Sequence, residues 1–288
     1  MIRARLNGII SPAFVTERIF YPGDRAPGPD FDPSTGLLEI RDAREAQALA
    51  ASEAEFFRDH GFALIGHRTA VRDWDSAGKA KDEVARLYHP EVDAIIREIL
   101  LPGRRIEIDQ SLKLLCRGGA DDAVYADWVH QDFGLTADDL SRNIGGIKTP
   151  ESARRWRARY ECSDVVGCVA ISFWRTIGMS EPLRHMPLAL CDPGSVAMDD
   201  VIAVAPAATG GSYHIGLRFD AAQAWYHYPR MRGDELLAFK LFECRKDDPA
   251  PERLRSVFHA AFDDPGMPAG AEPRRSCEHR VIVMVLAD

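Results

Sequence analysis

The first third of the chain carries apolar residues at helical spacing. Between residues 43 and 59, strong helix formers surround apolar positions that recur every three or four residues: Ala46, Leu49, Ala50, Ala54 and Phe57. Gly61 ends this predicted helix, and the apolar run 62–65 predicts a buried strand. A second helical region is expected over residues 74–101. Prolines and glycines punctuate residues 1–35 too often for a regular element, which predicts an arm laid over the domain.

Beyond residue 104 the pattern changes to short apolar and β-branched runs separated by turn residues. The predicted strands cover residues 105–115, 165–174, 212–219, 236–242 and 280–286. Helices followed by strands predict an α+β fold whose β part is a sandwich or barrel. We expect a single domain over residues 1–288, with the arm and helices in 1–104 and the β part in 105–288. The polar, arginine-rich stretch 135–160 is expected to form a lid.

The composition is that of an ordinary globular protein. Hydrophobic residues make up 46% of the chain and charged residues 28%, so neither a fibre nor a disulfide-stapled scaffold needs to be considered. At 288 residues the chain can bury a sizeable core. The net charge is -8, and the arginines alternate with acidic residues, as in residues 41–45. We therefore expect no binding to nucleic acid.

The sequence also bears on the compartment. It contains no apolar run of about 18 residues, so no membrane span is expected. The first 30 residues are charged and lack the apolar segment of a secretory signal. The six cysteines are dispersed, and no pair has the two-residue spacing of a zinc or redox motif. We expect reduced thiols and a cytoplasmic location.

A histidine and an aspartate suggest a metal site. His130 and Asp132 stand two residues apart, so on an extended segment both side chains point to the same face. Two histidines and one carboxylate around iron(II) leave three adjacent positions open, which O₂ chemistry with a bidentate co-substrate requires. By itself the pair is a common chance pattern. The second histidine has to come from later in the chain, where the candidates are His185, His214, His227, His259 and His279.

Several motifs follow one another in the second part of the chain. They are Val129–Asp132, Phe173–Arg175, Pro187–Asp192, Trp225–Met231, His259–Pro265 and Pro273–Arg280. Over roughly residues 105–286 this ordered set resembles the natural-product oxygenase family that contains the cephamycin methoxylation component, a fungal endoperoxide-forming enzyme and gibberellin desaturase-like proteins. The resemblance implies a double-stranded β-helix, a cupin-like jelly roll, with an N-terminal helical layer against one sheet. It also implies an enzyme that uses Fe(II), 2-oxoglutarate and O₂ to hydroxylate, desaturate or similarly oxidise a small-molecule secondary metabolite.

The resemblance also implies which residues form the site. In double-stranded β-helix oxygenases a Gly-Asp-x-Leu strand entry precedes the distal histidine, and an Arg-x-Ser strand follows it to hold the far carboxylate of 2-oxoglutarate. The corresponding segments here are Gly233–Leu236 and Arg274–Ser276, and His259 is the histidine between them. An arginine fork with a neighbouring hydroxyl suits the far carboxylate of 2-oxoglutarate. The implied residues are thus the metal ligands His130, Asp132 and His259 and the co-substrate residues Arg274 and Ser276.

Further pocket candidates are Trp174, Arg175, Trp225, Tyr226, Lys240 and Arg280. Arg280 shares a strand face with Arg274 and is the alternative clamp. Trp225 and Tyr226 are either core aromatics or pocket walls. Lys240 lies in an apolar strand, so its amine either reaches outward to water or meets a carboxylate in the pocket. Arg175 poses the same choice.

Two positions depart from the family pattern. This chain has Asp220–Gln223 where the family has Asn-Pro-x-His, and Thr176 where the family has the proline of Trp-Arg-Pro. If the missing histidine were the distal ligand, Gln223 would leave the metal site incomplete. Two alternatives therefore stay open: a cupin-type metal enzyme that does not use 2-oxoglutarate, and a degenerate, non-catalytic jelly-roll binding or accessory protein. The sequence leaves substrate identity and oligomeric state open.

Overall fold

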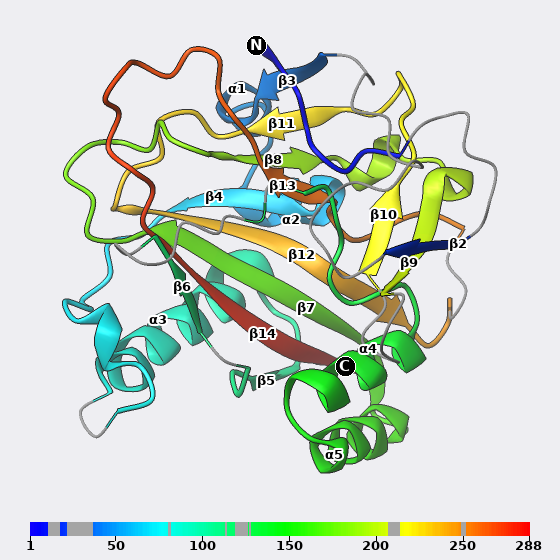
Figure 1. Ribbon diagram of the computed structural model, residues 1–288. Coiled ribbons are helices and arrows are strands. Elements are labelled where there is room, and N and C mark those ends of the chain that lie inside the picture. Colours follow the sequence, from blue (N-terminus) through cyan, green and yellow to red (C-terminus); the bar gives the residue numbers. More distant parts are fainter. Residues whose placement is uncertain are drawn as a thin grey trace.

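Two main sheets pack on a common core in the computed structural model of the protein, with helices around them (Figure 1). The structure describes residues 1–10, 18–21, 37–79, 82–112, 114–118, 126, 128–206, 214–248 and 252–288. The six-stranded sheet is called the large sheet below, and the five-stranded sheet the small sheet. Together with the helices they confirm the predicted α+β class with a two-sheet β part.

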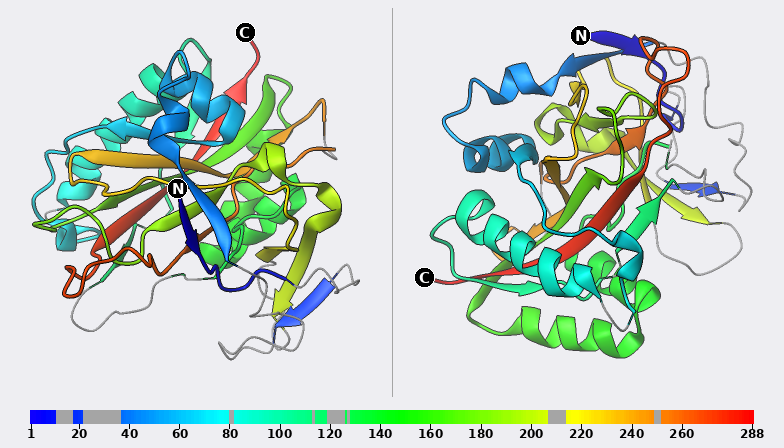
Figure 2. Two further views of the ribbon diagram at one scale, coloured as in Figure 1. Left: turned by 90° about the horizontal axis from the view of Figure 1, so that it is seen from above. Right: turned by 90° about the vertical axis from the view of Figure 1, so that its left-hand side faces the viewer.

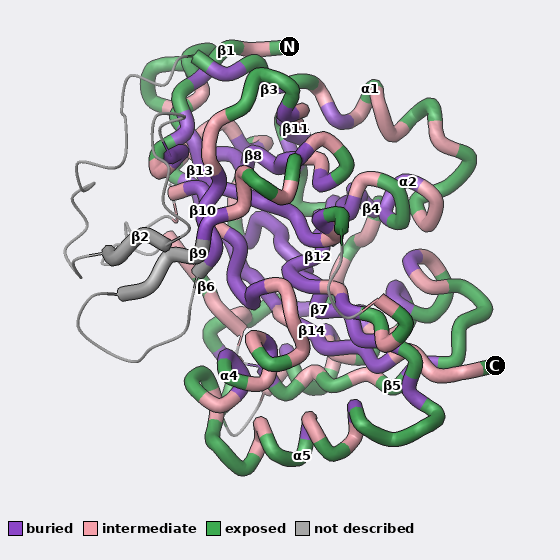
Figure 3. Tube along the Cα trace, turned by 90° about the vertical axis from the view of Figure 1, so that its right-hand side faces the viewer, coloured by how far each residue is buried: buried purple, intermediate pink, exposed green. Residues whose placement is uncertain are grey.

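The large sheet has the order β4-β12-β7-β14-β5, with β6 also paired to β14. Its strands are β4 (Phe62–Gly66), β5 (Ile106–Asp109), β6 (Leu115–Arg117), β7 (Val165–Thr176), β12 (Glu235–Arg245) and β14 (Ser276–Leu286). All its strand pairs are antiparallel. The three long strands β7, β12 and β14 are almost wholly buried (Figure 3), as expected for strands covered on both faces.

The small sheet has the order β1-β3-β11-β8-β13. Its strands are β1 (Ile2–Ala4), β3 (Leu38–Asp42), β8 (Leu188–Cys191), β11 (Trp225–His227) and β13 (His259–Ala261). A third sheet has the order β10-β9-β2, with β2 (Arg18–Tyr21), β9 (Val201–Pro206) and β10 (His214–Leu217). Successive side chains of β8 point to opposite faces of the small sheet and so belong to two different hydrophobic cores. Leu188 and Leu190 belong to the core that the small sheet forms with the large sheet. Ala189 and Cys191 belong to a second core on the opposite face.

Helices and short helical turns lie around the sheets (Figure 2). They are α1 (Ala43–Gln47), α2 (Glu53–His60), α3 (His89–Ala94), α4 (Ala137–Ile147) and α5 (Pro150–Glu161), with π-helical turns η2 (Val84–Tyr88) and η3 (Ile95–Leu100) and short 3₁₀ turns η1 (Trp74–Ser76), η4 (Pro193–Ser195) and η5 (Met198–Asp200). The N-terminal helices pack on the face of β14 that carries His279, whose ring lies 5.9 Å from that of Tyr88. That face is called the outer face below. The inner face points to the small sheet.

One predicted helix is two helices in the structure. The stretch 43–59 has high helix propensity throughout, yet α1 ends at Gln47 and α2 starts after the N-cap Ser52, whose side chain accepts from the Glu55 N–H. The Gln47 amide donates to the Leu64 carbonyl at 2.8 Å and accepts from the Leu64 N–H at 2.9 Å. This side-chain contact ties the end of α1 to β4, and α2 starts at its own cap, where the Ser52 hydroxyl accepts from the Glu55 N–H and the Glu55 carboxylate accepts from the Ala51 N–H.

The stretch 135–160, predicted to be a lid, is largely helical. Helices α4 and α5 pack on each other, and the Trp156 and Tyr160 rings stack with centroids 5.2 Å apart. Both rings are buried, and the Cys244 thiol of β12 donates to the Tyr160 hydroxyl at 3.4 Å. The two helices thus cover an end of the large sheet. Their movement over the site stays a prediction, as does the single-domain organisation.

Stability should depend on pH through His60 in the last turn of α2. Its ring Nδ1 lies 2.7 Å from Asp192 Oδ2, and this hydrogen bond raises the pKa of His60. The contribution is therefore fully present below about pH 6.5 and is lost as the pH rises through the higher folded-state pKa. Because the pair is partly exposed, we expect His60→Gln to cost about 0.5 kcal/mol at pH 5.5 and less at pH 9 in urea unfolding. An equal cost at both pH values would contradict this assignment.

Candidate metal centre

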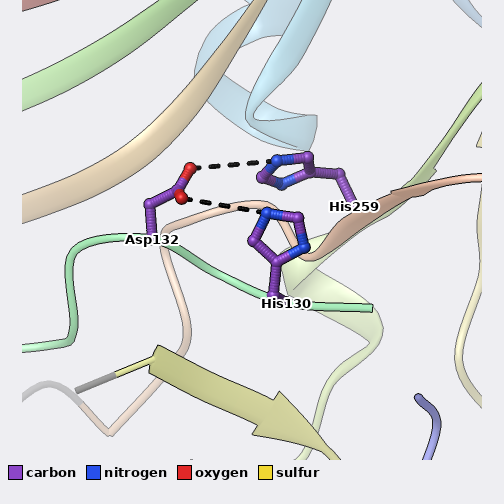
Figure 4. Close-up of side chains that lie close together, drawn as sticks. All are labelled: His130, Asp132 and His259. Carbon is purple, nitrogen blue, oxygen red and sulfur yellow. Dashed lines mark ion pairs between the residues drawn. The ribbon is translucent and has the colours of Figure 1, made fainter. Parts of the chain in front are cut away.

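The three predicted metal ligands come together between the two sheets (Figure 4). His259 is the first residue of β13, and His130 pairs with it through two backbone hydrogen bonds, His130 N–H to His259 carbonyl at 3.2 Å and the reverse at 3.1 Å. This bridge sets the two rings 4.4 Å apart. Asp132, two residues after His130, turns its carboxylate to the same side. Within the described ranges these three form the one His/Cys/Asp/Glu group with metal-ligand spacing.

The ligand atoms are arranged around a common point. Asp132 Oδ1 lies 3.8 Å from His130 Nε2, and Asp132 Oδ2 lies 3.9 Å from His259 Nε2. One ligand atom from each residue lies within 4.8 Å of the other two. With metal bonds of about 2.0–2.2 Å, adjacent ligand atoms stand roughly 3 Å apart, so these atoms would have to move about 1–2 Å closer together on metal binding. The donor set of two imidazoles and one carboxylate therefore fits a divalent metal with open positions.

Both imidazole rings are oriented with Nε2 as the nitrogen that can bind a metal. Nδ1 of His130 faces the Trp128 carbonyl at 2.5 Å, and Nδ1 of His259 faces the Val257 carbonyl at 3.2 Å. A carbonyl can only accept, so each Nδ1 carries the proton and each Nε2 keeps its lone pair. Burial, reinforced by the neighbouring His130, lowers the pKa of His259 to about 4. Its ring is thus neutral at pH 7, the form that binds a metal.

Arg274 and Ser276 lie on the inner face of the large sheet, both 1% exposed. The Arg274 guanidinium carbon sits 5.6 Å from the Trp174 ring centroid, and Nη1 donates to the Met186 carbonyl. The Ser276 hydroxyl is buried and has no hydrogen-bond partner among the described residues. Leaving a buried hydroxyl unsatisfied costs free energy, which a bound carboxylate would recover. The pair thus fits an anionic co-substrate.

Arg280 lies closer to the metal ligands than Arg274 does. Its Nη2 is 3.4 Å from Asp132 Oδ1, and its guanidinium lies over the Phe133 ring at 5.7 Å. On the other side of the site, the Phe239 ring of β12 packs against His259 with centroids 4.7 Å apart. Sequence analysis missed Phe133 and Phe239 as site residues. Phe239 sits in a strand that is apolar at successive positions, where no sequence signal marks the face that meets the metal.

The structure separates the remaining pocket candidates by face. Trp174 lies on the inner face beside Arg274. Tyr226 also points into the core between the sheets, with its ring 5.8 Å from that of Phe62. Trp225, the neighbouring residue, is buried in the second core on the other side of the small sheet, so it does not line this site.

Arg175 and Lys240 are turned away from the metal ligands. Arg175 lies on the outer face, where it donates to the carbonyls of His67 and Gly233 and sits 5.9 Å from the Trp74 ring. The Lys240 amine reaches α2, 5.2 Å from the Phe57 ring, and pairs with Glu243 at 2.9 Å. Lys240 therefore pairs with a carboxylate away from the triad, and Arg175 takes neither predicted course, because it is fully buried and bonded to backbone carbonyls.

The other histidines do not join the cluster. The His279 ring stacks on that of His89 at 4.8 Å on the outer face, and His227 packs edge-on against Phe262. His185 accepts from the Arg274 backbone N–H. The His214 side chain lies outside the described part of the chain. Gln223 donates to the Arg218 carbonyl at 2.6 Å and is not among the clustered ligands, so the departure at this position does not break the triad.

A family model described as an oxidoreductase/YMDC permease-like domain matches residues 18–284. The chain is 27% identical over 258 residues to the hydroxylase/desaturase efuI of Hormonema carpetanum, a match that covers 82% of this chain and 81% of that protein. It is 34% identical over 119 residues to the Fe(II)/2-oxoglutarate-dependent dioxygenase nvfI of Aspergillus novofumigatus, a match that covers 40% of each. The resemblance to natural-product oxygenases predicted from the sequence is thereby confirmed.

Solved structures share the fold. The iron and alpha-ketoglutarate-dependent endoperoxidase NvfI superposes with a TM-score of 0.66 at 21% identity, over 99% of this chain and 97% of that one. A second structure, of NvfI with different conformation, gives 0.67 at 21% identity over 99% and 98%. Across the described part of this chain, no helix is long and apolar enough to cross a membrane.

Proposed function

This chain belongs to the oxidoreductase/YMDC permease-like domain family, and we propose that it is an Fe(II)- and 2-oxoglutarate-dependent oxygenase with a double-stranded β-helix core. The observation that carries the proposal is the triad of His130, Asp132 and His259, on the inner side of the large sheet, the side that also carries the buried Arg274 and Ser276. Iron(II) with 2-oxoglutarate would supply oxidative decarboxylation of the keto acid by O₂, releasing succinate and CO₂ while a substrate C–H bond is oxidised.

Different residues of the protein would bind the metal and the co-substrate. The triad would hold the metal, and backbone carbonyls orient the rings of His130 and His259. Arg274 and Ser276 would bind the far carboxylate of 2-oxoglutarate through a charge-assisted fork and a hydroxyl donor. Arg274 suits this role better than Arg280, whose guanidinium already contacts the metal carboxylate. Burial of Asp132 and His259 keeps bulk water from the site.

The substrate would be a small molecule. The curated relatives are a hydroxylase/desaturase and a dioxygenase, and the solved relative is an endoperoxidase. These reactions all begin with oxidation of a C–H bond, and they support an oxidation of the same class here. A secondary metabolite is the kind of substrate that the resemblance to natural-product oxygenases favours.

The proposal is tested by succinate release. Iron-loaded protein supplied with 2-oxoglutarate and air should form succinate even without a primary substrate, slowly, and Asp132→Ala should not. Metal binding without any succinate would favour a cupin-type enzyme that does not use 2-oxoglutarate. Failure to bind iron(II) or cobalt(II) at all would favour a binding or accessory protein.

A further inference from the structure

A row of buried polar side chains leads from the large sheet to the metal ligands. The Ser172 hydroxyl of β7 donates to Glu278 Oε1 at 3.1 Å, and Arg280 Nε donates to the same oxygen at 2.8 Å. Arg280 Nη2 then reaches Asp132 Oδ1 at 3.4 Å. The row follows from the register of β7 and β14, which sets Ser172 opposite Arg280. No sequence pattern marks Ser172 as part of this row.

A buried row of charged and polar side chains is not needed to stabilise a protein core. Ser172 is fully buried, and Glu278 is 8% exposed. Apolar side chains of similar volume usually stabilise a core as well as a buried ion pair does, because burial of the charges offsets their attraction. An arginine guanidinium is charged throughout the pH range in which proteins are folded, so Arg280 places a positive charge beside the metal carboxylate.

The contacts of Asp132 differ between its two oxygens. Oδ1 faces both Arg280 Nη2 at 3.4 Å and His130 Nε2 at 3.8 Å, whereas Oδ2 faces His259 Nε2 at 3.9 Å. A guanidinium that binds one carboxylate oxygen competes with a metal ion for it. The other oxygen stays available as a ligand.

We propose that Arg280, oriented by Glu278 and Ser172, is a positioning residue that occupies Oδ1 and so restricts Asp132 to one metal-ligating oxygen. A carboxylate that bound through both oxygens would fill one of the three positions that 2-oxoglutarate and O₂ need. Arg280 thus protects the open positions and does not bind the far carboxylate itself. The inference rests on the proposed function, because it presupposes that His130, Asp132 and His259 hold a metal.

The test compares three variants. Arg280→Met combined with Glu278→Gln removes both charges of the pair, and Arg280→Lys keeps a positive charge and a donor. Arg44→Met is the matched control, since Arg44 makes a two-point ion pair with Glu235 at 2.8 and 2.9 Å at the end of β12, away from the triad. Thermal unfolding of each variant shows that it is folded before its ligand binding is compared.

Each protein is loaded with cobalt(II) without oxygen and titrated with 2-oxoglutarate and with 2-oxopentanoate, which lacks the far carboxylate. The double variant should bind cobalt at least as tightly as the parent and show an altered absorption spectrum before any keto acid is added. Its affinity for both keto acids should fall about tenfold, a typical effect of a residue that supports a metal ligand. Arg280→Lys should recover part of that affinity, and Arg44→Met should behave as the parent.

Three results would overturn the inference. The double variant could match the parent in spectrum and in both affinities. It could instead lose cobalt and keto acids to the same degree, as a purely structural role requires. Loss of affinity for 2-oxoglutarate but not for 2-oxopentanoate would make Arg280 the far-carboxylate clamp. A parent protein that binds no cobalt would overturn the proposed function, and this inference with it.

Discussion

Replacing His259 by alanine should lower the affinity for iron(II) or cobalt(II) by about 100-fold or more, since even residues that only support a ligand cost ~10–100-fold. The same loss is expected for His130→Ala and Asp132→Ala, because each leaves a two-point site. The measurement is metal occupancy after equilibrium dialysis, at equal protein concentration, with folding checked by circular dichroism.

The controls are two histidines that the structure places elsewhere. His227 is 4% exposed and His279 fully buried, and neither belongs to the triad. Their alanine variants should keep the metal if they fold. Full occupancy in His259→Ala together with loss in His227→Ala or His214→Ala would show that the distal ligand is assigned wrongly.

Replacing Arg274 by alanine should weaken 2-oxoglutarate binding by tens- to thousands-fold while metal binding survives. Removing one partner of a buried, hydrogen-bonded charge pair costs ~2–5 kcal/mol. Lysine should substitute poorly, because it offers a point charge and no planar fork. Ser276→Ala should cost less, since a hydroxyl supplies a single neutral donor. Anaerobic calorimetry of the cobalt(II) protein measures all three variants.

Binding of 2-oxopentanoate, the keto acid without a far carboxylate, distinguishes the role proposed for Arg274 from that proposed for Arg280. Arg274→Ala should bind 2-oxopentanoate as the parent does, because the group that Arg274 recognises is missing from this ligand. Its cobalt spectrum without keto acid should also be unchanged. If Arg274→Ala binds 2-oxoglutarate with the affinity of the parent, the carboxylate clamp lies elsewhere.

Much of the site could be predicted because strand geometry has a period of two. The spacing of His130 and Asp132 implied a shared direction, and the positions 274, 276, 278 and 280 implied a shared face of one strand. The structure brings all three predicted ligands together and puts Arg274, Ser276 and Arg280 on the inner face. Choosing His259 among five histidines needed the family motifs, since no local pattern marks it.

The direction of residues in the long strands could not be predicted. Strands β7 and β12 are buried on both faces, so apolar residues occur at successive positions and hide the alternation. For this reason the sequence could not place Arg175 and Lys240 on the outer face. The pairing of Ser172 with Arg280 depends on the register of β7 against β14, which are far apart in the chain. Ser172 and Glu278, which form a hydrogen bond, are separated by 106 positions.

The break between α1 and α2, in contrast, has a local signal. Ser52 is followed three residues later by Glu55, a pattern typical of a helix N-terminus, and in the structure the Ser52 hydroxyl accepts from the Glu55 N–H. Register and strand face are set by contacts between distant segments.

Anaerobic titration of the iron(II) protein with 2-oxoglutarate tests the central claim most directly. When the keto acid chelates the metal in a site of two histidines and one carboxylate, a visible metal-to-ligand charge-transfer band should grow and saturate at one equivalent. Asp132→Ala should show no band under the same conditions. Iron that binds to the parent but gives no band with saturating 2-oxoglutarate, or a band that persists in Asp132→Ala, would contradict the account.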